Sequence, residues 1–159
     1  SRIVTCLPKD SLKIDQDCHV INSVYSESLK KWLWIDPTFD AYVMNEKGEM
    51  LSIAEVRERL INDKTLILNP DANWNNQSAQ TKEDYLENYM AKNLYMLECP
   101  ASSEYNMETN SEGKTYNYIR LLPLDYIEQK PDKEEDKREK SNTTWITHKT
   151  NNPNVFWEL

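Results

Sequence analysis

Glycine is scarce in this chain, with only Gly48 and Gly113 among 159 residues. A loop that holds a phosphate needs several glycines close together, because the backbone must approach the ligand closely. Neither glycine has another glycine near it, so the usual nucleotide-binding loops are excluded. Both glycines instead predict turns, at residues 45–48 and 110–113.

Basic residues are also in the minority. The chain has 19 Lys and Arg against 27 Asp and Glu, which gives a net charge of −8. This charge disfavours electrostatic binding to nucleic acid or to an anionic membrane. No apolar run approaches the ~20 residues of a transmembrane helix, and no signal peptide is visible. We therefore expect no nucleic-acid partner and no membrane span.

Cysteine and histidine are few, with three and two residues respectively, and their spacing matches no metal-binding motif. We expect neither a metal nor another cofactor. The odd number of cysteines leaves the redox compartment open, and a disulfide between Cys6 and Cys18 on neighbouring strands is sterically conceivable. The length suits one domain, or one domain with an appendage.

The most informative segment is a predicted β-hairpin near the N-terminus. Residues 18–25 and 31–36 are rich in β-branched and aromatic side chains, and the polar residues 26–29 lie between them. If residues 26–29 form the loop, Tyr25 pairs with Lys30, and His19 lies opposite Asp36. Opposed residues share a face with Cβ atoms about 5 Å apart, so a hydrogen bond between imidazole and carboxylate is expected. A register slip of one residue would place the two on opposite faces.

A histidine oriented by a carboxylate is the base half of a nucleophilic triad, although an ordinary surface pair is the alternative. The chain offers no convincing nucleophile for His19. Cys18 adjoins it on the strand and points to the opposite face. Cys6 ends a short apolar run and is typical of a buried strand thiol; because its strand could neighbour that of His19, it stays a remote candidate. Cys99 has no basic neighbour that would stabilise a thiolate.

The local motifs of the hairpin carry a resemblance. Residues 19–25 read His-Val-Ile-Asn-Ser-Val-Tyr and residues 31–38 read Lys-Trp-Leu-Trp-Ile-Asp-Pro-Thr. They resemble the His and Asp motifs of the transglutaminase-like superfamily, which are papain-like cysteine hydrolases. Residues 1–5 also resemble the Arg-x-Val strand of that family, so the likeness covers about the first quarter of the chain. Ile21 stands where the family usually has Trp, and Ser23 where Glu is common.

This resemblance implies a Cys-His-Asp triad acting on amide or peptide bonds, with His19 as proton shuttle and Asp36 as its orienter. The family places the nucleophile at the start of a helix upstream of the Arg-x-Val strand. The chain would then be a C-terminal fragment that lacks this helix and is inactive alone. Its partners would be a protein or peptide substrate and the upstream part of the same protein. Bacterial members are often exported, which favours a periplasmic or extracellular location.

Two other interpretations remain open. The chain could be a degenerate, non-catalytic family member that binds protein or carbohydrate, or a structural domain with a chance hairpin. The polar loop at residues 69–80 bears on the first of these, because Trp74 could either rim a cleft or be buried under the loop. Tyr25 and Trp34 could likewise line a cleft or belong to the core.

The rest of the chain predicts an α+β fold, an antiparallel meander of hairpins with two packed helices, as a partial transglutaminase-like domain. Ser52 and Glu55 form a capping box before one helix, and Thr81 is a candidate N-cap for a second helix that extends to Tyr95. Apolar stripes at helical spacing indicate that both helices pack on the core. Hairpins are expected at residues 41–51 and 104–122.

The C-terminal part is the most charged. Eleven of the thirteen residues from 128 to 140 are charged, and opposite charges at helical spacing favour a short exposed helix. Residues 143–147 and 155–157 alternate about an Asn-Asn-Pro-Asn segment and predict a final hairpin. These patterns divide the chain into a His/Asp half of the core at residues 1–70, a helix and hairpin extension at 71–128, and a charged helix with hairpin at 129–159.

Overall fold

The computed structural model describes residues 1–9, 18–102, 113–123, 133–138 and 142–158. The chain has a mixed α+β fold, as the sequence predicts. Its contacts separate two compact units, Ser1–Tyr95 and Met96–Leu159. This division falls at a different place from the boundaries expected after residues 70 and 128.

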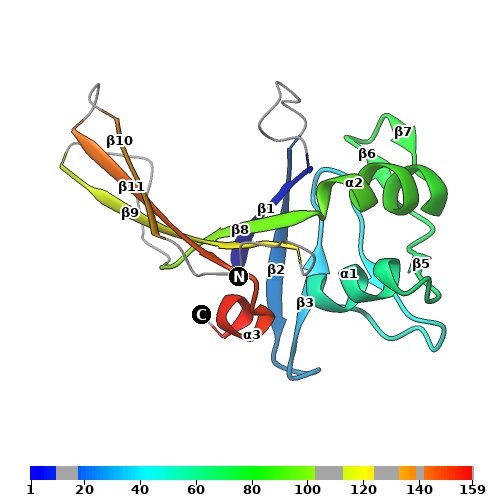
Figure 1. Ribbon diagram of the computed structural model, residues 1–159. Helices are drawn as coiled ribbons and strands as arrows, with labels where there is room; N and C mark the ends of the chain where they lie inside the picture. Colours follow the sequence, from blue (N-terminus) through cyan, green and yellow to red (C-terminus); the bar gives the residue numbers. More distant parts are fainter. Residues whose placement is uncertain (10–17, 103–112, 124–132, 139–141, 159) are drawn as a thin grey trace. The chain divides into compact units, whose positions relative to one another are not determined.

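The first unit is built on three antiparallel strands, β1 (Arg2–Leu7), β2 (His19–Ser26) and β3 (Lys31–Ile35) (Figure 1). One face of these strands is largely buried and has an apolar centre. Val4, Ile21 and Trp34 contribute the centre of that face, one from each strand. The alternation of buried and exposed residues along β1 and β2 follows the period of two that a half-buried strand requires.

The hairpin of β2 and β3 is present, but its predicted register is wrong by two residues. Tyr25 pairs with Trp32 rather than with Lys30, and Ser26 with Lys31. The loop therefore contains residues 27–30, and Lys30 takes the left-handed conformation with φ 52°. Because the shift is an even number of residues, every side chain keeps the face that the sequence assigned to it.

Short strands and a tight turn complete the sheet structure of this unit. Strand β4 (Val43–Met44) pairs antiparallel with β5 (Ile67–Leu68), and β6 (Asn73–Trp74) with β7 (Ser78–Ala79). The predicted turn at residues 45–48 is confirmed: Gly48 has φ 77°, and the Asn45 side chain accepts the backbone N–H of Lys47.

Both predicted helices are present. Helix α1 (Ile53–Ile61) starts with the predicted capping box of Ser52 and Glu55. The second helix begins with η1 (Glu83–Met90), which has the wider turn of a π-helix, and continues as α2 (Ala91–Asn93). Thr81 precedes this helix, and its hydroxyl accepts the backbone N–H of Asp84 in the first turn. The stripe of the second helix buries Tyr85, Leu86 and Met90.

The second unit is a mixed sheet with a short helix. Its strands are β8 (Met96–Pro100), β9 (Thr115–Leu121), β10 (Lys133–Arg138) and β11 (Thr143–Thr150), in the order β10-β11-β9-β8. Strands β9 and β11 are parallel, and the Tyr116 and Trp145 rings stack where they pair. Helix α3 (Pro153–Trp157) buries Phe156.

Three expectations for the C-terminal half are wrong. The sheet is not an antiparallel meander, because β9 and β11 are parallel. Residues 133–138 form strand β10 rather than a helix. Antiparallel pairing with β11 gives this strand hydrogen bonds along one edge, whereas charge pairs stabilise an isolated helix by only about 0.2–0.5 kcal/mol each. The final hairpin is replaced by α3, since Asn152 caps a helix turn with Pro153 at its start. The strand expected at 104–109 lies outside the described residues.

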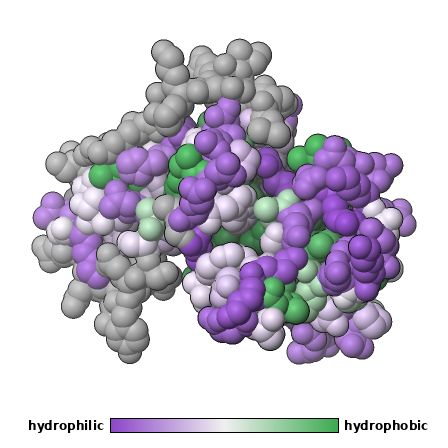
Figure 2. Space-filling model, turned by 90° about the horizontal axis from the view of Figure 1, so that it is seen from below, coloured by the Kyte–Doolittle hydropathy of each residue, from purple (hydrophilic) through white to green (hydrophobic). Residues whose placement is uncertain are grey.

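The surface is largely polar. On the face drawn in Figure 2, hydrophilic residues cover most of the described surface and apolar residues form small separate patches. Within the described part of the chain, no helix has the length and apolar character needed to cross a bilayer.

The capping box gives a stability prediction. Ser52 Oγ accepts the Glu55 N–H at 3.2 Å, and the Glu55 carboxylate accepts the Ser52 N–H at 2.7 Å. Replacement Ser52→Ala leaves one helix N–H without its side-chain acceptor and should lower the free energy of unfolding by about 1 kcal/mol in urea denaturation. Ser28→Ala, at an exposed loop position, is the matched control and should change it by less than about 0.5 kcal/mol. Equal losses in the two variants would contradict the assignment.

Candidate functional site

The structure brings His19 and Asp36 together. His19 is the first residue of β2 and Asp36 directly follows β3, and His19 Nε2 lies 2.5 Å from Asp36 Oδ2. Both side chains are buried, with 7% of His19 and 0% of Asp36 exposed. The residue directly opposite His19 is Cys6 on β1; the contact with Asp36 is diagonal and depends on the shared face.

Asp36 is the centre of a hydrogen-bond network. Its Oδ2 accepts from His19 and from the Tyr85 hydroxyl, which lies 2.6 Å away. Its Oδ1 accepts the backbone N–H groups of Thr38 and Phe39 at 3.0 and 3.3 Å, an Asx turn made by the Asp-Pro-Thr segment. A carboxylate can be buried without a large penalty only when it is hydrogen-bonded in this way.

Tyr85 joins the network from helix η1. Its hydroxyl oxygen accepts the Trp34 Nε1–H at 3.2 Å while its own proton goes to Asp36. Burial, and then the charge of Asp36, raise the pKa of Tyr85 well above its ordinary value, so the phenol remains a neutral donor. The sequence assigned Tyr85 only to the core stripe. The available signal was its hydroxyl, because a buried tyrosine needs a polar partner.

Aromatic rings enclose the imidazole. Phe39 and Tyr89 pack edge-on against the His19 ring, with centroids 5.3 and 5.4 Å away. Tyr85 and Tyr89 lie on the same face of η1, and both contact the Phe39 ring. With Nε2 bonded to Asp36, the nitrogen left to exchange a proton with a reacting group is Nδ1.

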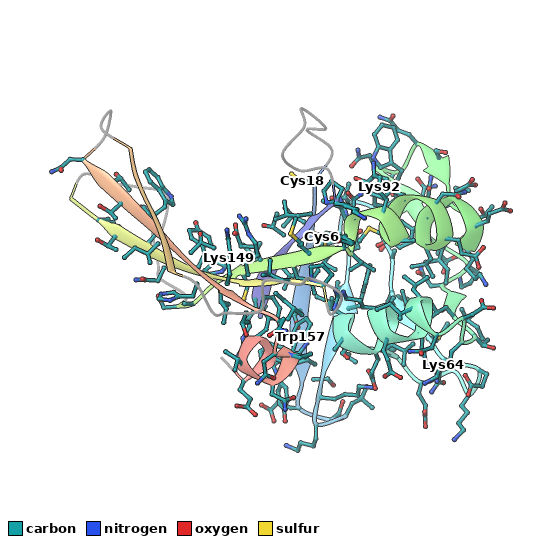
Figure 3. All side chains as sticks on the ribbon, viewed as in Figure 1. Cys6, Cys18, Lys64, Lys92, Lys149 and Trp157 are labelled. Carbon is teal, nitrogen blue, oxygen red and sulfur yellow. The ribbon has the colours of Figure 1, made fainter. Side chains whose placement is uncertain are left out.

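None of the three cysteines is placed as a nucleophile for His19. Cys6 is opposite His19 but fully buried, and burial and the Asp36 charge raise the pKa of its thiol, which opposes thiolate formation. Cys18 is exposed and Cys99 is buried in β8. None of the three cysteines forms a disulfide, so the conceivable Cys6–Cys18 bridge is absent. Figure 3 shows Cys6 on β1 and Cys18 just before the start of β2.

The Phe39 and Tyr89 rings that contact the imidazole also line a groove. Its volume is about 390 Å³, and its lining is Phe39, Trp74, Gln80 and Tyr89. All four side chains are uncharged, and two of them are the rings that contact His19. Trp74 is 43% exposed, which favours the cleft-rim interpretation over a buried tryptophan. Trp34 is fully buried, and Tyr25 packs against Trp32 instead.

The chain was compared with protein-family models, with curated proteins and with solved structures, and no match was found. The transglutaminase-like resemblance therefore stays a prediction, as does the catalytic role of His19 and Asp36. In the described residues, no cluster of three or more His, Cys, Asp or Glu side chains is arranged to hold a metal ion.

Thiol reactivity tests this placement of the cysteines. Because Cys18 is exposed while Cys6 and Cys99 are buried, the native protein should show one fast-reacting thiol with a chromogenic disulfide reagent and three after denaturation. Cys18→Ser should remove the fast phase, and Cys99→Ser, the control, should leave it intact. A fast phase that persists in Cys18→Ser and disappears in Cys6→Ser would show that Cys6 is reactive.

Proposed function

We propose that this chain supplies the histidine and aspartate of a Cys-His-Asp triad in a transglutaminase-like cysteine hydrolase or acyl transferase. The observation that carries the proposal is the buried contact between His19 Nε2 and Asp36 Oδ2 at 2.5 Å. The motifs around both residues support it, as does the aromatic enclosure of the imidazole.

The chemistry follows from the two nitrogens of His19. Asp36 accepts a hydrogen bond from the Nε2–H group, which keeps the proton on Nε2 and leaves Nδ1 with its lone pair, ready to take a proton from a thiol. The thiolate attacks an amide carbonyl; the C–N bond breaks, the amine leaves with the proton from Nδ1, and an acyl thioester remains. Water or a second amine then attacks the thioester and gives a proton to Nδ1; the C–S bond breaks, and the sulfur leaves with the proton from Nδ1 as the regenerated thiol. The first route gives hydrolysis and the second gives acyl transfer.

The thiol in this proposal comes from outside these residues, as an upstream part of the same protein. Cys6, buried and with a raised thiol pKa, and the exposed Cys18 both lack the helix N-terminus that stabilises the thiolate in the family. We infer that the 159-residue chain alone does not turn over amide substrates.

The groove supports a peptide or protein substrate. Its rings border His19, so a side chain of the substrate seated there would lie beside the reacting amide. Its lining has no charged group, and aromatic faces favour uncharged, flat or apolar groups.

Mutation of the pair tests the proposal in the full-length protein. His19→Ala and Asp36→Asn should each lower kcat for release of an amine from a peptide amide by roughly 10³–10⁴-fold, because the base or its tautomer is lost. His148→Ala, the other histidine of the chain, is the control and should retain full activity. Full-length protein whose turnover survives His19→Ala would falsify the proposal, and so would turnover by the isolated chain carrying Cys6→Ala.

The groove also favours a second candidate function, a non-catalytic domain that binds peptide or carbohydrate. Trp74, with its exposed ring, would stack on the ligand in either case. Catalysis predicts turnover by the full-length protein, whereas a binding domain predicts affinity without turnover at any chain length.

The variant Trp74→Ala tests the groove. In an active protein KM should rise roughly tenfold with kcat retained, since stacking binds substrate and transition state alike. In a binding domain the dissociation constant of a peptide or oligosaccharide, measured by calorimetry, should rise by a similar factor. Trp32→Phe, at the far end of the β2–β3 hairpin, is the control. Unchanged KM and unchanged affinity would show that the groove binds nothing.

A further inference from the structure

One oxygen atom of Asp36 serves two side-chain donors. His19 Nε2 and Tyr85 Oη both lie against Oδ2, at 2.5 and 2.6 Å. Both donors and the acceptor are buried, with Tyr85 and Asp36 wholly withdrawn from solvent. Bulk water therefore cannot replace either hydrogen bond. The two donors share the negative charge of one oxygen, so a change in one hydrogen bond changes the charge available to the other.

The position of the carboxylate is held by other contacts. Its Oδ1 is bound by two backbone N–H groups, and the Asp36 backbone exchanges two hydrogen bonds of 2.9 Å with Ala41. The Tyr85 hydroxyl is therefore not required to place Asp36. What it changes is the negative charge on Oδ2.

Trp34 fixes the direction in which the hydrogen bonds of this network are donated. Trp34 Nε1–H is a donor only, and it donates to Tyr85 Oη at 3.2 Å. The phenol oxygen is then occupied as an acceptor, and its single proton points to Asp36. A hydroxyl that accepts a hydrogen bond also donates more strongly. Trp34 thus donates to Tyr85 and Tyr85 to Asp36, and His19 donates to the same Asp36 oxygen.

We propose that Tyr85, polarised by Trp34, is a positioning residue of the His19–Asp36 pair that shares Oδ2 and so limits the negative charge presented to the imidazole N–H. Its catalytic consequence rests on the proposed function. An imidazolium stabilised less strongly by its carboxylate returns its proton more readily to the leaving amine. Tyr85 acts through Asp36.

Proton NMR of the imidazole tests the sharing directly. The chain has only two histidines, and His148 is exposed on β11, so ¹⁵N-histidine labelling gives one buried and one reference signal. In Tyr85→Phe, His19 becomes the sole side-chain donor to Oδ2, its hydrogen bond strengthens, and the Nε2 proton should shift downfield. Trp34→Phe should shift it in the same direction by less. Tyr25→Phe, which removes a partly exposed hydroxyl elsewhere on β2, is the control and should not shift it.

A second measurement uses the intact side chain. Replacing tyrosine with 3-fluorotyrosine makes the phenol a stronger donor, so the His19 signal should shift upfield, and this shift should vanish in Tyr85→Phe. Opposite signs for the two changes support charge sharing. No shift, or an upfield shift in Tyr85→Phe, overturns it, because a merely structural tyrosine would loosen the His19–Asp36 bond when removed.

The NMR test needs no nucleophile, so its failure and the failure of the proposed function are distinguishable. In an active full-length protein, Tyr85→Phe should lower kcat and leave KM unchanged. An unchanged kcat alongside the expected NMR shifts would overturn the catalytic consequence alone.

Discussion

The buried carboxylate of Asp36 is the constraint on which the first unit depends. An ionised carboxylate without solvent must be surrounded by donors, because an unsatisfied buried charge costs several kcal/mol. Here the donors come from three separate parts of the chain: the start of β2, the turn after β3, and helix η1. The network therefore ties the helix to the hairpin as well as orienting His19. The same residue serves the fold and the candidate chemistry.

The surroundings of the pair suit proton transfer better than they suit nucleophilic attack. Two aromatic rings, Phe39 and Tyr89, pack against the buried imidazole, and both also line the groove with Trp74 and Gln80. The thiol closest in register, Cys6, lies where burial and a neighbouring carboxylate both oppose the thiolate. A buried His–Asp pair without an activated thiol is consistent with a nucleophile supplied by another segment. It is equally consistent with a domain that binds a ligand and catalyses no reaction.

Much of the local structure could be predicted from the sequence. The capping box at Ser52, the turn at Gly48 and the β2–β3 hairpin all depend on neighbouring residues, and all are present. The predicted hairpin register is wrong by two residues because the loop of four residues begins one residue later than expected, at position 27, and a run of polar residues does not specify where a loop begins. The error kept the face of His19, since side chains alternate with a period of two. The C-terminal predictions failed where long-range pairing decided the outcome, as for the strand at residues 133–138, which pairs with β11.

By itself the sequence determined that His19 and Asp36 share a face, because strand parity and the flanking motifs are local properties. Only the tertiary structure decided which other groups reach them. Tyr85 lies 49 positions from Asp36 along the chain, and its helical stripe predicts a core position equally well for a tyrosine or a leucine. The packing of η1 on the hairpin turns that core position into the second donor to Oδ2. Burial then makes the hydrogen bond obligatory, since no water is present to replace it.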